Sequence, residues 1–227
     1  KPVDNYVKTE NGGNNMNVRK RVLVACETSG IVREAFRREG FDAWSCDLLP
    51  SDDGSPYHRV CDMRDMLYLE HWDMLIAHPP CTRLCNSGVR WLHKPPKGKT
   101  IEQMFSELDE GTDLFSVCLN APVKHVAVEN PVMHHLAKKR IRNYRKFSQS
   151  VQPWQFASDP DGPDNAKKRT CLWLRSLPPL QPTGTLDGST ARADVHLASP
   201  SPDRWKQRSK FFPGIARAMA QQWGGLL

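Results

Sequence analysis

Short apolar runs, separated by polar turns or by stretches with helical spacing, set the pattern of this chain. Runs of this length, rich in β-branched and aromatic residues, are typical of buried strands. Strands are predicted at Arg21–Cys26, Phe41–Cys46, Tyr57–Cys61, Met74–Ala77, Lys124–Val128 and Thr170–Leu174.

Between these runs, apolar residues recur at helical spacing. Helices are predicted at Ile31–Arg38, Ile101–Leu119, His134–Phe147 and Ile215–Trp223. Either Thr28 or Ser29 is expected to cap the first of them, because short hydroxyl side chains suit that position. In the long second helix, Met104, Leu108 and Phe115 are expected to face inward.

Strands that alternate with helices predict an α/β fold with a doubly wound, mostly parallel sheet. The 227 residues suit one domain. Residues 1–18 are polar and rich in Asn and Gly, and are expected to form a flexible tail. Residues 19–227 would form the domain, in which 176–202, rich in Pro, Ser, Thr and Gly, would be a surface connection.

A chemically useful residue follows nearly every predicted strand. Glu27-Thr-Ser-Gly30 follows the first, and Asp47, Asp62, Cys81 and Glu129 follow later ones. The strand before Cys81 must stop at Pro79-Pro80, because prolines donate no ladder hydrogen bonds. Since parallel strands end along one edge, where ligands bind in such folds, the pattern predicts an active site at that edge.

Charge and cysteine usage narrow the class of protein. The formal net charge of +7 and the pI of about 9.1 favour a polyanionic partner such as nucleic acid. The 7 cysteines include no Cys-x-x-Cys pair, so neither a disulfide framework nor a metal site is predicted. With no secretory signal and no long apolar run, we expect a soluble, cytoplasmic protein without a membrane partner.

The residues at the predicted edge suggest two kinds of chemistry. A turn that opens a helix can hold an anionic group, and Asp47 would suit ribose hydroxyls. Only Gly30 of a Gly-x-Gly-x-x-Gly pattern is present, which leaves a nucleoside-containing cofactor open. Cys81 is a candidate nucleophile with Arg83 close in sequence, and Glu129 is a candidate acid.

In their order and spacing, these motifs resemble the cytosine-C5 DNA methyltransferase family over most of residues 20 to 224. Pro80-Cys81 resembles the family's Pro-Cys nucleophile motif, and Glu129-Asn130-Pro131 its Glu-Asn-Val motif. Asn165-Ala-Lys-Lys-Arg169 looks like a variant of Gln-x-Arg-x-Arg. Phe212-Pro-Gly-Ile-Ala216 lies where the final cofactor-side motif would be.

The resemblance implies S-adenosyl-L-methionine as the cofactor. Its binding residues would be the turn Glu27, Thr28, Ser29 and Gly30, then Asp47 and Leu48 at the ribose, Asp62 and Met63 at the adenine, and Pro80.

The resemblance also implies a covalent mechanism. Cys81 would add to C6 of a cytosine, Glu129 would assist at N3, and C5 would take the methyl group. Lys167 or Arg169 would contact the base or steady its loop. In duplex DNA the base must leave the stack, which is cheaper in single strands.

A basic loop follows the Pro-Cys motif, and the predicted loop covers Asn86–Thr100. Its candidate DNA-binding residues are Arg83, Arg90, Lys94, Lys97 and Lys99. The wording of this stretch is similar to short methylase-like proteins of bacteriophages, which implies action in a bacterial cytoplasm on duplex or single-stranded DNA.

Departures from the family pattern leave its finer features open. Typical members carry a large target-recognition region after the Arg motif, and only Arg175 to about Asp203 is available here. We therefore expect short sequence specificity, a homodimer or helper subunit, or another substrate. Transfer of a group other than methyl to the same carbon also fits the motifs.

Other hypotheses compete with C5 methylation. An exocyclic-amino methyltransferase would use a Pro-Pro motif at this strand end, but His78 and Cys81 stand where it prefers other residue types. A degenerate methylase fold that only binds nucleic acid or cofactor is a second alternative. A cysteine hydrolase, with His78 or His125 as the base, is a third.

Overall fold

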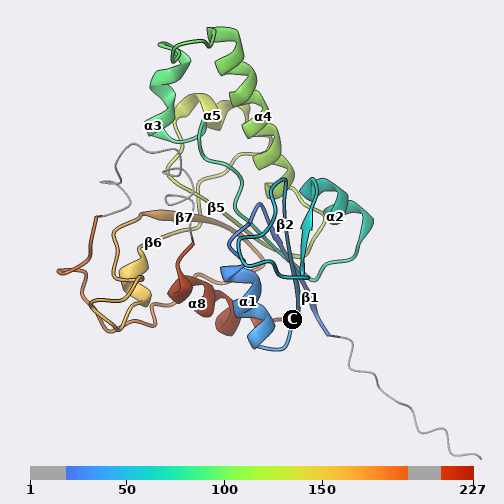
Figure 1. The fold of residues 1–227 in the computed structure, drawn as a ribbon, viewed down its shortest axis with the longest axis vertical. Coiled ribbons are helices and arrows are strands. Elements are labelled where there is room, and N and C mark those ends of the chain that lie inside the picture. The colour runs from blue at the N-terminus through green and yellow to red at the C-terminus, as the bar shows by residue number, and fades with distance from the viewer. Residues whose placement is uncertain (1–18, 194–210) are drawn as a thin grey trace, which may run out of the picture.

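A seven-stranded sheet forms the centre of the protein, in a computed structural model that describes residues 19–193 and 211–227 (Figure 1). Its spatial order is β3-β2-β1-β4-β5-β7-β6. The strands are β1 Arg21–Ala25, β2 Asp42–Asp47, β3 His58–Val60, β4 Met74–Ala77, β5 His125–Asn130, β6 Gln149–Val151 and β7 Thr170–Arg175. The helices are α1 Ile31–Arg38, α2 Met63–Leu69, α3 Asn86–Val89, α4 Ile101–Leu119, α5 His135–Arg140 and α8 Pro213–Gly224, with short 3-10 turns η1 Arg90–Leu92 and η2 Pro153–Phe156.

Five neighbouring strands run parallel, from β3 through β5. Strand β7 lies antiparallel to β5, and β6 lies antiparallel to β7. The chain therefore has an α/β fold with a mostly parallel, mixed sheet. This strand order is consistent with the Rossmann-like fold of methyltransferases.

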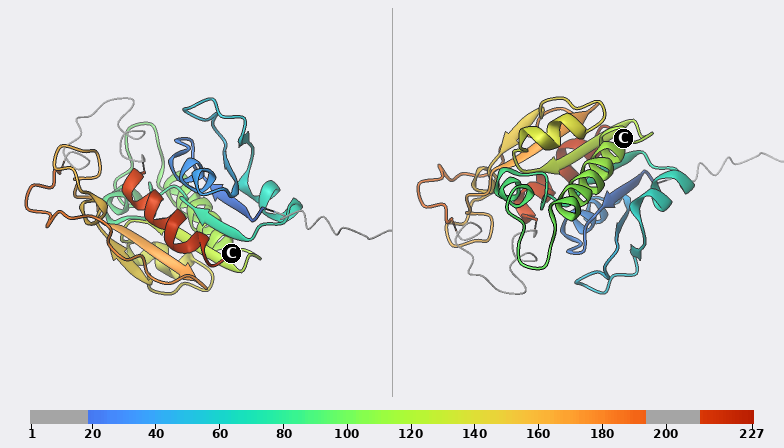
Figure 2. Two further views of the ribbon diagram at one scale, coloured as in Figure 1. Left: turned by 90° about the horizontal axis from the view of Figure 1, so that it is seen from below. Right: turned by 90° about the horizontal axis from the view of Figure 1, so that it is seen from above.

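The two faces of the sheet pack against different helices, which the two views of Figure 2 show from opposite sides. On one face, Val22 and Ile76 share a buried cluster with Phe36 of α1 and Trp223 of α8. On the other, Leu75 shares a cluster with Phe115 of α4, among others. Because both faces are covered, the strands are apolar along their whole length, and their ends are left for chemistry.

The apolar pattern located most elements correctly. The predictions for α1, α4 and β4 match the observed bounds, and the other strands differ by a few residues at their ends. Met104, Leu108 and Phe115 are fully buried, as expected. One boundary matters for the site, because Glu129 belongs to β5 instead of following it.

Several predictions about local structure were wrong or incomplete. The helix predicted over His134–Phe147 covers only His135–Arg140, and α2 and the short strand β6 were not foreseen. Helix α2 begins after Asp62, whose carboxylate accepts a 2.8 Å bond from the Arg64 N–H. The short helix α3 and turn η1 occupy part of the predicted loop 86–100.

The described part of the predicted surface connection, residues 176–193, packs against the domain. The side chain of Gln149 makes hydrogen bonds of 2.7 and 2.8 Å to the backbone of Leu180. The Trp223 indole donates to the carbonyl of Pro178, and the Lys167 N–H donates to the carbonyl of Arg192. The rest of that connection, 194–202, and the predicted tail, 1–18, lie outside the described residues.

Across the ranges 19–193 and 211–227, no helix combines the length and apolar content needed to cross a membrane.

Candidate active site

The ends of β4 and β5 bring the two main candidates together. In the parallel register, Ala77 pairs with Val128, so the next residues, His78 and Glu129, are neighbours on the same face of the sheet. The His78 N–H also donates a 2.9 Å bond to the carbonyl of Ala25, which extends the β1–β4 ladder by one residue. Cys81 follows three residues after this fixed point.

The loop that carries Cys81 is held against the chain that follows β5. The buried Asn130 donates a 2.7 Å bond to the carbonyl of Pro79. His134 makes two more contacts, because its N–H donates to Leu84 O at 3.0 Å and its Nε2 lies 2.7 Å from Arg83 O. Since the His134 Nδ1 accepts from the Ala137 N–H, Nε2 is the nitrogen that donates. The Pro-Pro-Cys loop is therefore rigidly positioned relative to Glu129.

Glu129 lies in a nearly enclosed, positively charged environment. Its Oε2 is 3.5 Å from His78 Nδ1, and the two side chains are 13% and 11% exposed. Burial alone would raise the pKa of Glu129, but the contact with His78 and the charge of Lys168 outweigh burial and lower that pKa. The His78 ring also packs on Phe211, with centroids 4.7 Å apart. The carboxylate is therefore ionised and has two cationic partners at hand.

Cys81 is paired with a second thiol, Cys85. The chain makes one turn between them, in which the N–H groups of Leu84 and Cys85 both donate to the Cys81 carbonyl. The hydrogen bond to Cys85, together with burial and the nearby Glu129, raises the pKa of Cys81. The same bond from Cys81, helped by the Ser87 hydroxyl 3.0 Å away, lowers the pKa of Cys85 to about 5. The pair therefore shares one proton, which rests on Cys81.

Glycine at position 88 allows this turn to pack closely. A Cβ at Gly88 would lie 2.2 Å from the carbonyl oxygen of Thr82. Any larger residue would push α3 away from the turn that holds the two thiols.

The turn after β1 differs from the expected one. Neither Thr28 nor Ser29 is the cap of α1, whose N-cap residue is Gly30 with a φ of 68°. The buried Glu27 takes this role, because its carboxylate accepts from the N–H groups of Val32 and Arg33 at 2.8 and 3.3 Å. The Ser29 hydroxyl donates to Glu27 and accepts a longer bond from the Ile31 N–H. The helix start is thus already occupied by a carboxylate of the protein.

The loop after β2 lies against this turn. The Asp52 N–H donates to Thr28 O at 2.8 Å, and Asp53 pairs with the fully buried Arg33. Arg33 also donates to the Ser45 hydroxyl at 2.7 Å. At Gly30 a Cβ would collide with the Arg33 guanidinium, so glycine is required there for space as well as for its positive φ.

The predicted ribose and adenine residues lie at the ends of β2 and β3, as their positions after these strands implied. Asp47 ends β2, and one of its oxygens accepts from the Leu49 N–H. Leu48 is 72% exposed. Asp62 caps α2 and pairs with the Arg64 guanidinium at 2.8 Å, while Met63 is buried.

In the Asn165–Arg169 stretch, the residue next to the two predicted ones faces the site. Lys168 is the cation that acts on both Glu129 and Cys81, and it lies 5.6 Å from the Phe212 ring. Arg169 donates to the Ser150 hydroxyl, and Lys167 is exposed. Strand alternation could have found Lys168, because it is in phase with Thr170 and Leu172 on the Glu129 side of the sheet.

The other member of that stretch has a structural partner. Asn165 is fully buried, and its amide donates to the Pro160 carbonyl and to Thr190. It therefore fixes the loop that leads into Lys168.

The basic loop is partly neutralised. Arg83 and Lys99 both pair with Glu107 of α4, the former at 2.6 Å. Their charges lower the pKa of Glu107. Arg90, Lys94 and Lys97 are exposed, and the Arg90 guanidinium lies 4.3 Å from the Trp91 ring. These three cations remain the more available part of the loop.

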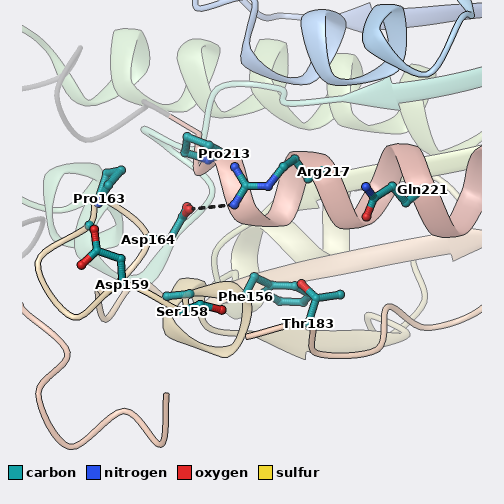
Figure 3. A pocket seen from close by; sticks show the side chains of 11 residues that line it. Phe156, Ser158, Asp159, Pro163, Asp164, Thr183, Pro213, Arg217 and Gln221 are labelled. Carbon is teal, nitrogen blue, oxygen red and sulfur yellow. Dashed lines mark ion pairs between the residues drawn. The ribbon is translucent and has the colours of Figure 1, made fainter. Parts of the chain in front are cut away.

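A separate hollow of about 490 Å³ lies beside α8 and holds none of the predicted site residues. Figure 3 shows Asp164 and Arg217 facing each other there, at 3.6 Å. Asp164 also accepts a bond from the Gly214 N–H at the start of α8. In the part of the chain that the structure describes, no cluster of three or more His, Cys, Asp or Glu side chains could hold a metal ion.

Comparison with protein-family models and with curated proteins gave no match.

Proposed function

We propose that the protein transfers a methyl group from S-adenosyl-L-methionine to C5 of cytosine in DNA. The observation that carries the proposal is the pairing of a thiol loop with a buried carboxylate at neighbouring strand ends. The Asn130–Pro79 hydrogen bond and the His134 contacts hold Cys81 and Glu129 in a fixed relation. A nucleophile and a carboxylate on opposite edges of one ring is the arrangement that attack at C6 with assistance at N3 requires.

The residues around the β1 turn fit this cofactor better than a dinucleotide. A pyrophosphate would need the free N–H groups at the start of α1. Glu27 already accepts from those of Val32 and Arg33, and its charge would repel phosphate. The partly exposed Asp47 carboxylate at the end of β2 suits ribose hydroxyls. When bound, the cofactor would supply an electrophilic methyl group on its sulfonium.

The steps assigned to the protein follow from the site. The Cys81 thiolate forms a bond to C6, and the displaced π electrons pass through C4 to N3, which takes a proton. Glu129 delivers that proton and recovers it from His78, which is 3.5 Å away. Lys168 stabilises the thiolate and orients the ring, while Phe211 and Phe212 exclude water. After C5 has been alkylated and has lost its proton, the C6–S bond breaks and restores the ring.

For the nucleic acid, the available cations of the basic loop favour backbone contacts. Arg90, Lys94 and Lys97 would bind phosphates, with Trp91 as a nearby aromatic surface. Residues 176–193 use their backbone to pack on the domain, so sequence reading would come from a second copy or a helper subunit, or be short.

Covalent trapping tests the proposal directly. The protein is incubated with S-adenosyl-L-methionine and 5-fluorocytosine DNA, single- and double-stranded, beside Cys81→Ala. A Cys81-dependent adduct that carries one methyl group is expected on a denaturing gel and by mass spectrometry. Cofactor binding without any adduct would contradict the proposal and favour a binding-only protein. An adduct of another mass would keep the nucleophile but change the transferred group.

A further inference from the structure

The thiol pair, Cys81 and Cys85, has a feature that the proposed reaction does not by itself require. A nucleophilic thiol needs to lose its proton, and the usual acceptor is a nearby histidine. The nearest imidazole in the site, His78, contacts Glu129. His134 uses both ring nitrogens for the Arg83 carbonyl and the Ala137 N–H. Cys85 is the group that is hydrogen-bonded to the Cys81 thiol.

The surroundings of Cys85 suit a thiolate. Its sulfur lies 3.0 Å from the Ser87 hydroxyl, and the N–H groups of Ser87 and Gly88 point toward it. Cys85 is 9% exposed, so water competes little with these donors. Its backbone is fixed on two sides, by the bond to the Cys81 carbonyl and by a bridge to Met133.

We propose that Cys85 is the proton acceptor that activates Cys81. The proton of the Cys81 thiol moves to the Cys85 thiolate, and the freed electron pair of Cys81 forms the new bond to C6. When the C6–S bond breaks, Cys81 leaves as a thiolate and takes the proton back from Cys85, which restores the resting pair. The proposal rests on Cys81 being the nucleophile of the proposed function, yet the proton sharing can be measured without DNA or cofactor.

Alkylation by iodoacetamide, which reacts with thiolates, provides that measurement. Trypsin cleaves after Arg83 and places Cys81 and Cys85 on separate peptides, so mass spectrometry can follow each rate. In the unmodified protein at pH 6, we expect one label per pair, added faster than the label on the partly exposed Cys61. Reactivity of the pair should fall only as the pH drops through about 5, where Cys85 becomes protonated.

Variants separate proton acceptance from simple packing. In Cys85→Ser, alkylation of Cys81 at pH 7 should slow by about tenfold or more, since an isolated thiol is only a few per cent ionised there. Its pH midpoint should also rise by several units. Ser87→Ala keeps both thiols and should give a smaller rise. Ser106→Ala on α4, an exposed serine away from the pair, is the matched control and should leave the midpoint unchanged.

The outcomes are distinct. Equal Cys81 alkylation in Cys85→Ser and the parent from pH 5 to 8 would overturn the proposal. If that variant fails to fold, a parent pair that reacts at pH 6 no faster than Cys61 would overturn it as well. The expected alkylation profile without any 5-fluorocytosine adduct would support the proton pair and contradict the proposed methyl transfer. The two ideas therefore fail separately.

Discussion

The side chain of Asn130 joins the ends of two strands, because its amide donates a 2.7 Å hydrogen bond to the carbonyl oxygen of Pro79. Asn130 is 1% exposed, so no water can replace this donor easily. Asn130→Ala should lower the free energy of unfolding by about 1–3 kcal/mol, the usual cost of leaving a buried polar group unpaired. Chemical denaturation measures this change. Alkylation of Cys81 should change as well, and an unchanged rate would show that the bond does not position the loop.

Gly88 and Gly111 form a matched pair of glycines. In Gly88→Ala the new Cβ meets the Thr82 carbonyl at 2.2 Å, and we expect a loss of about 1–3 kcal/mol from overpacking. In Gly111→Ala the new Cβ meets only a Leu84 methyl at 3.4 Å. Since α4 gains helix propensity there, that variant should be neutral or more stable by up to about 1 kcal/mol. Thermal unfolding distinguishes the two, and equal effects would contradict the close approach at Gly88.

Glu129 should make stability depend on pH in a defined direction. Its pKa is lower in the folded protein than in the unfolded chain, so its contribution is complete above the unfolded value of about 4.3. That contribution is lost as the pH falls through the folded value. Glu129→Gln should therefore be less stable than the parent at pH 7, by about 1–3 kcal/mol, with a gap that narrows in acid. Urea denaturation of both proteins from pH 7 to 3 gives the gap, and a constant gap would refute the assigned charge.

Three adjacent cations allow a test of which one serves the site. Lys168→Met should slow formation of the 5-fluorocytosine adduct by about tenfold or more, because it removes a charge that acts on both Cys81 and Glu129. Lys167→Met and Arg169→Met remove the same charge from positions with other surroundings, and should have smaller effects. A larger effect at Arg169 would restore the interpretation taken from the family motif.

Glu107 is expected to restrain DNA binding by the loop. Glu107→Gln removes the partner of Arg83 and Lys99, so both cations become available to phosphates. Affinity for single-stranded DNA should rise, and the slope of binding against salt concentration should steepen by one to two phosphate contacts. Fluorescence anisotropy at several salt concentrations measures both. Ser106→Ala, one residue away, is the control and should bind like the parent.

The apolar pattern was enough to predict most of the sheet, because its strands are buried on both faces and their hydrophobic runs are continuous. The position of Cys81 and Glu129 at one edge followed from parallel strands ending together. The end of the predicted helix at Phe147 did not follow, because Ile141–Phe147 supplies a connection and a buried aromatic contact instead of further turns. Strand β6 has three residues, too few to show a period.

The finer parts of the site depend on side-chain geometry that spacing does not contain. Lys168 was passed over because the family motif drew attention to its neighbours, although the phase of β7 favours it. The roles of His78 and Cys85 arise from contacts between residues that the motif treats separately. Likewise, Glu27 was placed in the turn correctly, but its use as the cap of α1 needed the carboxylate position.

The carboxylate of Glu27 at the head of α1 means that the protein carries its own counter-anion where related sheets leave room for one. A nucleotide that enters with phosphates would have to displace that internal group or face its charge, whereas a cofactor with an amino-acid tail meets no such competition. Selection between the two abundant kinds of adenosine compound in a cell is thus made by one buried side chain, before any contact with the adenine or ribose.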